Sequence, residues 1–100
     1  MDKILMVEDE KELARVTKDY FSSRGYLLEV INDGQQALDY LMLNSVKLLL
    51  LDIMLPGVDG LTICEKVREH SNIPIIIISA LTGEEARIKG IELGADDYIE

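Results

Sequence analysis

Four consecutive leucines, Leu48 to Leu51, lead directly into a carboxylate, Asp52, and Pro56-Gly57 follows a few residues later. An apolar run of this kind is typical of a strand buried on both faces, as in a parallel sheet covered by helices. Burying an ionised carboxylate costs free energy unless the group is paired or bound to a metal. We therefore expect Asp52 to lie where this strand opens into a crevice, because open α/β sheets place their ligand sites there.

Apolar runs of strand length recur along the chain, at Ile4–Val7, Leu27–Ile31, Leu48–Leu51, Ile75–Ile78 and Tyr98-Ile99. The segments between them have apolar residues at helical spacing, which in the first segment are Leu13, Val16, Tyr20 and Phe21. Helix starts are expected at Asp33 and Asp59, helix stops at Gly25 and Gly94, and a fourth helix over Glu84 to Leu93. Alternating strands and helices predict an α/β fold, a doubly wound parallel sheet with helices on both faces.

The composition narrows the class of protein. One hundred residues with a hydrophobic fraction of 48% predict one domain, residues 1–100, with its own core. Asp and Glu number 19 against 10 Lys and Arg, and the net charge of −9 argues against direct binding to nucleic acid. The lone cysteine, Cys64, forms no internal disulfide, and neither a signal peptide nor an apolar run of the ~20 residues that a membrane span needs is found. We expect a cytoplasmic protein that contacts no membrane.

Polar side chains follow the first, third and fourth predicted strands: Glu8 and Asp9, then Asp52, then Ser79. The carboxyl ends of these strands converge at one edge of such a sheet, so three carboxylates share a crevice. Each pair at ~4 Å repels by about 4 kcal/mol at an effective dielectric of about 20. A hard cation such as Mg²⁺ removes this repulsion, and the backbone carbonyl of Met54 offers one more oxygen ligand.

A carboxylate nucleophile, a metal and the hydroxyl of Ser79 are together the parts needed for phosphoryl transfer onto Asp52. Each part alone has an ordinary explanation. Acidic residues after a strand favour a helix start, and a lone serine suits a turn. The combination predicts the chemistry.

These motifs resemble the receiver domains of bacterial two-component response regulators. The matching segments are Ile4–Glu10, Leu51–Gly60, Pro74–Ala80 and Gly94–Tyr98, which follow in the family's order. The resemblance implies a flavodoxin-like, five-stranded parallel sheet of order 2-1-3-4-5, with four helices in this chain. It also implies a histidine kinase as the phosphoryl donor.

The resemblance assigns a role to each candidate residue. Asp52 is the phosphoacceptor, Asp9 binds Mg²⁺ directly, Glu8 binds it through water, and Met54 contributes its carbonyl. Ser79 is the switch hydroxyl and Tyr98 is the aromatic switch. A phosphoryl group adds acceptor oxygens, Ser79 moves to meet one, and Tyr98 turns inward. This local change biases a two-state surface around the fourth helix and the fifth strand.

The charged residues of the fourth helix and fifth strand are similar to the dimerising face of the OmpR/PhoB subfamily, whose effector is a winged-helix DNA-binding domain. The similarity implies transcription control, with a kinase and an effector domain as partners. The family's lysine falls at position 101 and its final helix later still, so we expect a truncated domain that is phosphorylated slowly. An open strand edge and an uncovered apolar face on Ile75–Ile78 predict self-association.

Three alternative functions are considered. A degenerate receiver that acts only as a protein-interaction module fits the same motifs. A Mg²⁺-dependent aspartyl phosphatase of the haloacid-dehalogenase type needs a second aspartate where Met54 stands, so turnover of external substrates is not expected. A nucleotide- or flavin-binding module needs a glycine-rich loop after the first strand, where the chain has Glu8-Asp9-Glu10-Lys11.

Overall fold

The computed structural model describes residues 3–52, 55, 58–78, 88, 91–92 and 94–99. Five strands form one parallel sheet of order β2-β1-β3-β4-β5. They are β1 (Lys3–Val7), β2 (Leu27–Ile31), β3 (Leu48–Leu51), β4 (Ile75–Ile78) and β5 (Asp97–Ile99). The predicted fold class and strand order are confirmed, and the strand bounds differ from those predicted by at most one residue.

Three helices lie wholly within the described residues: α1 (Lys11–Ser23), α2 (Gly34–Leu43) and α3 (Gly60–His70). The predicted helix starts are correct, because Asp33 accepts the N–H of Gln36 at 3.0 Å and Asp59 accepts that of Leu61 at 2.6 Å. Gly25 and Gly94 both have positive φ, 85° and 111°, as expected of helix stops. Most of the helix predicted over 84–93 lies outside the described residues, although residues 88, 91 and 92 are helical.

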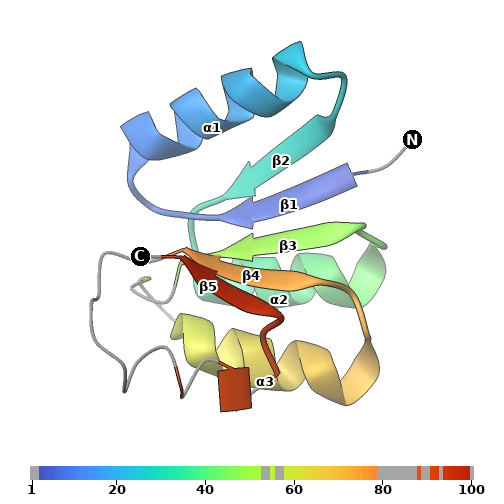
Figure 1. Cartoon of the computed structure of the whole chain (residues 1–100). Helices are drawn as coiled ribbons and strands as arrows, with labels where there is room; N and C mark the ends of the chain where they lie inside the picture. The colour runs from blue at the N-terminus through green and yellow to red at the C-terminus, as the bar shows by residue number, and fades with distance from the viewer. Residues whose placement is uncertain are drawn as a thin grey trace.

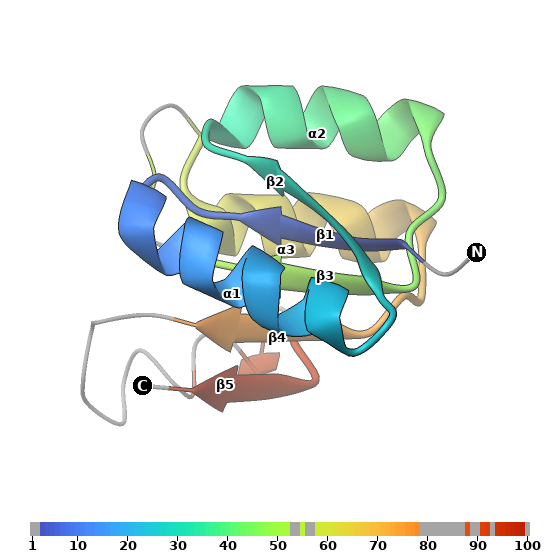
Figure 2. The same cartoon turned by 90° about the horizontal axis from the view of Figure 1, so that it is seen from above.

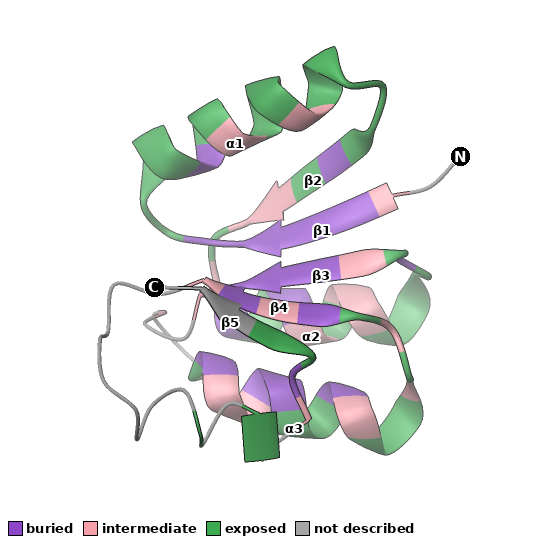
Figure 3. Cartoon of the chain, viewed as in Figure 1, coloured by how far each residue is buried: buried purple, intermediate pink, exposed green. Residues whose placement is uncertain are grey.

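Helix α1 lies on one face of the sheet, and α2 and α3 lie on the other (Figures 1 and 2). Each face carries a separate core. Side chains of successive strand residues point to opposite faces, so Leu5 and Val7 face α2 and α3, whereas Ile4 and Met6 face α1. The larger core lies under α2 and α3 and includes Ala37, Leu49, Leu51, Ile63, Cys64, Val67, Ile75 and Ile77. Figure 3 shows that burial is concentrated in the strands and in the sheet-facing sides of these helices. Cys64 is fully buried there as a small apolar side chain.

The predicted open apolar face on β4 is only half correct. Ile75 and Ile77 are fully buried in the larger core, and only Ile76 and Ile78, which point toward the α1 side, are partly exposed. The prediction treated the four isoleucines as one surface, but a strand divides its side chains between two faces.

Helix α1 covers its face of the sheet incompletely. Its buried contacts come from Ala14 and Phe21, while Leu13, Val16 and Tyr20 remain 41%, 50% and 54% exposed. The spacing of these apolar residues therefore predicts the helix correctly, yet the sheet contacts only one side of the apolar stripe.

Candidate metal centre

The register of the central strands brings the candidate carboxylates to one edge of the sheet. Val7 of β1 lies opposite Leu51 of β3, so the residues that follow each strand emerge together. The ladder extends one step further, because the N–H of Asp52 donates to the carbonyl of Val7 at 3.0 Å. On the other side the N–H of Glu8 donates to the carbonyl of Ile31 in β2, also at 3.0 Å. The backbone at the edge of the site is therefore held by the sheet itself.

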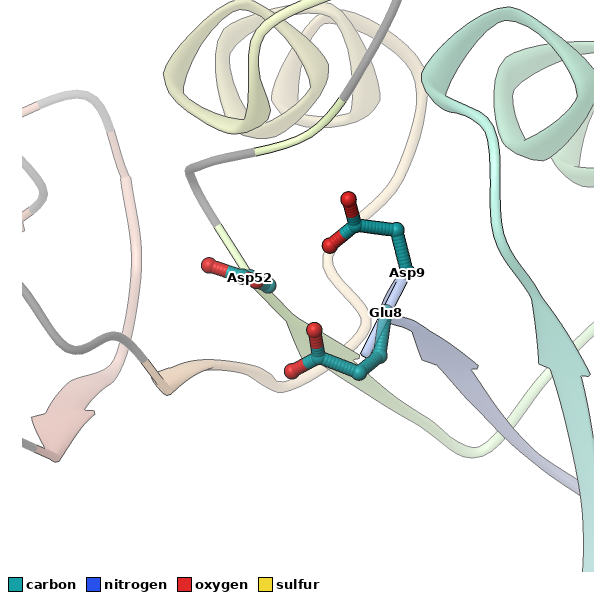
Figure 4. Close-up of side chains that lie close together, drawn as sticks. All are labelled: Glu8, Asp9 and Asp52. Carbon is teal, nitrogen blue, oxygen red and sulfur yellow. The ribbon is translucent and has the colours of Figure 1, made fainter. Parts of the chain in front are cut away.

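Glu8, Asp9 and Asp52 each offer a carboxylate oxygen, and these oxygens lie within 4.8 Å of one another. Figure 4 shows the three side chains converging from the ends of β1 and β3. Their exposure is graded: Glu8 is only 4% exposed, Asp52 is intermediate, and Asp9 is open to solvent. The arrangement is an acidic pocket with one buried wall and one open side.

The surroundings in this pocket raise the pKa of Glu8. Burial is the largest cause that raises the pKa of Glu8, followed by a hydrogen bond shared with Asp52 and by the charges of Asp52 and Asp9. The N–H of Glu10, which donates to Glu8 at 3.1 Å, acts in the opposite direction and stabilises the ionised form. The net result is a Glu8 pKa of about 7. A proton shared with Asp52 therefore relieves part of the repulsion, and a cation would do the same.

The start of α1 accounts for a different carboxylate. Glu10 is the N-cap of this helix, and its side chain accepts the N–H groups of Glu12 at 3.1 Å and Leu13 at 2.9 Å. The ordinary helix-start explanation for acidic residues after a strand thus applies to Glu10. It leaves the convergence of Glu8 and Asp9 on Asp52 to be explained in another way.

Sequence reasoning missed two features of this site. It did not separate the N-cap role of Glu10 from the cluster, and it did not predict that Glu8 is almost fully buried. The available signal was position, because Glu8 continues directly from four buried residues, Ile4 to Val7.

The structure does not describe the side chains of three candidate residues. Met54 and Ser79 lie outside the described residues. Tyr98 is in β5, paired with Ile77 of β4, but its side chain is likewise outside what the structure describes. Their predicted roles therefore remain predictions.

The comparisons with known proteins identify the class of protein that carries this fold and site. The family model for the response regulator receiver domain matches residues 4–100. The chain belongs to this family, whose members are signalling domains of two-component systems rather than enzymes of the usual kind.

The relatives extend the comparison. The chain is 45% identical over 97 residues to the transcriptional regulatory protein BaeR of Escherichia coli, covering 97% of this chain and 40% of BaeR. It is 41% identical over 99 residues to the response regulator ArlR of Staphylococcus haemolyticus, covering 99% of this chain and 45% of ArlR. The chain thus spans less than half the length of these curated relatives.

The solved structures agree with the fold. The BeF3-activated receiver domain of RstA from Klebsiella pneumoniae superposes with a TM-score of 0.94 at 35% identity, over 98% of this chain and 84% of that one. Among the residues that our structure describes, no helix combines the length and apolarity that crossing a bilayer requires.

The donor set of the pocket suits one class of metal. All three side chains offer carboxylate oxygens. Such ligands favour hard divalent cations over softer transition metals. The open side at Asp9 leaves room for water or for phosphate oxygens in the remaining coordination positions. The residues present therefore fit a Mg²⁺ ion.

Proposed function

We propose that residues 1–100 form one receiver domain that accepts a phosphoryl group on Asp52 from a histidine kinase, in a Mg²⁺-dependent reaction. The observation that supports this proposal is the convergence of Glu8, Asp9 and Asp52 within 4.8 Å, with graded burial, at the carboxyl edge of the sheet. Membership of the receiver family supports the donor and the direction of transfer.

The graded burial of the three carboxylates supports Asp52 as the proposed acceptor. Glu8 is almost fully buried and shares a hydrogen bond with Asp52, so an incoming donor cannot reach it easily. Asp9 is exposed, and its place on the open side suits a direct metal ligand. Asp52 has intermediate exposure, and its backbone is held by Val7. It is therefore both reachable and positioned.

The proposed transfer forms one bond and breaks one. An Oδ of Asp52 attacks the phosphorus of the phosphohistidine, the P–N bond breaks, and the nitrogen electron pair returns to the imidazole, which takes up a proton. Glu8, Asp9, Asp52 and the carbonyl of Met54 would hold the Mg²⁺. The bound ion would supply positive charge against the carboxylates and the phosphoryl oxygens.

The output of the domain is proposed from the family and from the relatives. Ser79 would donate a hydrogen bond to the phosphoryl group, and Tyr98 would change orientation in response. BaeR is named a transcriptional regulatory protein and is longer than this chain, which supports a DNA-binding effector domain in the full-length protein. We further propose a cytoplasmic location and no turnover of external substrates.

The direct test is a titration of the 100-residue chain with Mg²⁺ and then beryllofluoride, a phosphoryl mimic, while tyrosine fluorescence is followed. The RstA receiver domain is described as BeF3-activated, which supports the choice of probe. A saturable change that needs Mg²⁺ and disappears in Asp52→Asn is expected. Asp19→Asn, which alters an exposed carboxylate on α1, is the matched control and should respond like the wild type.

A receiver that serves only as a protein-interaction module is the second candidate. The raised pKa of Glu8 favours it to a degree, because a proton shared with Asp52 already relieves the pocket without a metal. No saturable response to Mg²⁺ and beryllofluoride in a folded chain would select this function over phosphoryl acceptance.

Self-association of the chain also stays a proposal. In the described part of the sheet β5 pairs only with β4 and is an edge strand, and strand edges favour pairing with another chain. Sedimentation that shows a monomer at all concentrations would contradict it.

A further inference from the structure

Glu10 connects the acidic pocket to helix α1 through hydrogen bonds of both its backbone and its side chain. Its N–H donates to Oε2 of Glu8 at 3.1 Å. Its two carboxylate oxygens accept the N–H groups of Glu12 at 3.1 Å and Leu13 at 2.9 Å, and its carbonyl accepts that of Ala14 at 3.1 Å. An N-cap needs only the contacts to the helix. The bond to Glu8 is additional, and it leads into the pocket.

The residue between the two glutamates is Asp9, whose side chain is exposed, so packing does not hold it in place. Figure 4 shows Glu8 and Asp9 reaching the pocket from the end of β1. The backbone is held on both sides of Asp9. Before it, the N–H of Glu8 donates to the carbonyl of Ile31 at 3.0 Å, and after it, Glu10 is bound to the first turn of α1. The position of the Asp9 carboxylate therefore depends on these two attachments.

We propose that Glu10 is a positioning residue for the metal centre. By capping α1 and binding Glu8, it holds the backbone of Asp9 in the conformation that brings the three carboxylates together. This inference rests on the proposed Mg²⁺-dependent function of the pocket. Glu10 itself is not a ligand in this arrangement, because both of its carboxylate oxygens are used by α1.

The expected effect of Glu10 on metal affinity is a matter of preorganisation. Without the side-chain cap, two N–H groups in the first turn of α1 lose their acceptor and the turn frays. The N–H of residue 10 then leaves Glu8, and the segment around Asp9 has to be ordered when the cation binds. Ordering at that step lowers affinity. The free energy of a typical cap corresponds to about a fivefold change in a dissociation constant.

The first experiment is calorimetric titration of the 100-residue chain with Mg²⁺ at fixed pH and salt. Glu10→Ala should raise the dissociation constant about fivefold over that of the wild type. Asp33→Ala is the matched control, because Asp33 is the acidic N-cap of α2, following β2, and accepts the N–H of Gln36 at 3.0 Å. Both variants lose one cap and one negative charge, but only the first loses a connection to the pocket. Asp33→Ala should stay within about twofold of the wild type.

A third variant separates the cap from the charge of Glu10. Glu10→Ser removes the charge but supplies a side chain that is preferred at N-caps. Its dissociation constant for Mg²⁺ should be within about twofold of the wild-type value, because the start of α1 is again held. Thermal melts of all three variants verify folding.

The second experiment needs no metal. Amide hydrogen exchange of the metal-free chain, followed by NMR and corrected for the intrinsic rate of each sequence, reports the bond from position 10 to Glu8. In Glu10→Ala this amide should exchange at least about threefold faster, and Glu10→Ser should restore its protection. A cap with a purely local role would speed exchange at Glu12 and Leu13 alone.

Two results would overturn this inference and leave the proposed function in place. One is a wild type that binds Mg²⁺ with a Glu10→Ala variant that binds it equally well. The other is unchanged exchange at position 10 in Glu10→Ala. A folded wild type that shows no saturable binding of Mg²⁺ would instead contradict the proposed metal site, and the positioning role of Glu10 with it.

Discussion

The two ends of the sheet differ in what surrounds their acidic side chains. At the amino end, Asp96 accepts the guanidinium of Arg68 at 2.7 Å and the N–H of Ile75 at 2.8 Å. At the carboxyl end, Glu8, Asp9 and Asp52 converge on each other, and the pKa of Glu8 rises to about 7. The first arrangement satisfies a charge within the fold. The second concentrates charge of one sign, which an added ligand can relieve.

The charge of Arg68 has a structural role, because its guanidinium is hydrogen-bonded within the fold. Besides Asp96, its guanidinium donates to the carbonyls of Gly94 at 2.7 Å and Ile73 at 2.6 Å. It thereby joins α3 to the starts of β4 and β5. The comparison teaches that the acidic pocket is under electrostatic strain while the opposite end is not, so mutations at the two ends should have different consequences.

The largest expected effect is at Asp52. Asp52→Asn should reduce labelling by a small phosphodonor or a histidine kinase to background, because the acceptor oxygen is replaced by an amide. Stability should stay equal or increase, since a like charge is removed from the pocket. Autoradiography and thermal melting measure the two effects. If this variant were labelled to the same level as the wild type, the acceptor would be a residue other than Asp52.

Replacing Arg68 should reduce stability and leave the metal site nearly unchanged, the reverse of what we expect for Asp52→Asn. Arg68→Met removes the side-chain donor to the carbonyls of Gly94 and Ile73 and leaves Asp96 with only the N–H of Ile75 among its described partners, so we expect a loss of about 2 kcal/mol in the free energy of unfolding. Mg²⁺ affinity should change less than about twofold, because the site is at the other end of the sheet. Urea unfolding and metal titration measure these. Arg15→Met, which removes two exposed ion pairs on α1, should change the free energy of unfolding far less than Arg68→Met does.

The raised pKa of Glu8 should make the stability of the metal-free chain depend on pH. Its pKa in the folded state, about 7, is above the ordinary value of 4.5, so the folded state holds the proton more tightly than the unfolded state. Without metal, stability should therefore be greatest below about pH 4.5 as far as Glu8 is concerned, and fall as the pH rises toward 7. Urea unfolding of the metal-free chain at several pH values measures this slope.

Mg²⁺ affinity should change with pH in the opposite sense. The proton on Glu8 competes with the cation, so affinity should rise between about pH 5 and 8. Glu8→Gln removes the titrating group and should flatten both profiles. An unchanged pH dependence in this variant would show that another group is responsible.

The smallest effect belongs to Cys64, which lies at neither end. Burial raises the pKa of its thiol, so it should react slowly with a thiol reagent in the folded chain and at the ordinary rate in urea. The ratio of the two rates, measured by absorbance, reports opening of the larger core. Fast labelling of the folded chain would contradict the burial of α3 against the sheet.

Local patterns were sufficient to predict most elements of this fold. Apolar runs mark the strands, and Asp33 and Asp59 mark the starts of α2 and α3, because capping and strand burial depend on residues close together in the chain. The convergence of Glu8, Asp9 and Asp52 was also predicted, because strand ends in a parallel sheet share an edge.

Other features depend on residues far apart in the chain. Arg68 and Asp96 are separated by 28 positions, and no spacing rule connects them. The exposure of Leu13 and Val16 was also missed, since a helical pattern does not say how much of the apolar stripe its sheet will cover.

The amino-acid sequence by itself determined the strands, the starts of α2 and α3 and the family, since each follows from short-range patterns and the spacing of a few motifs. Only the tertiary structure decided that Glu8 is buried, Asp9 is open and Asp52 lies between them. The reason is physical: burial and pKa depend on which surfaces pack together, and that is a property of the assembled sheet rather than of any one segment.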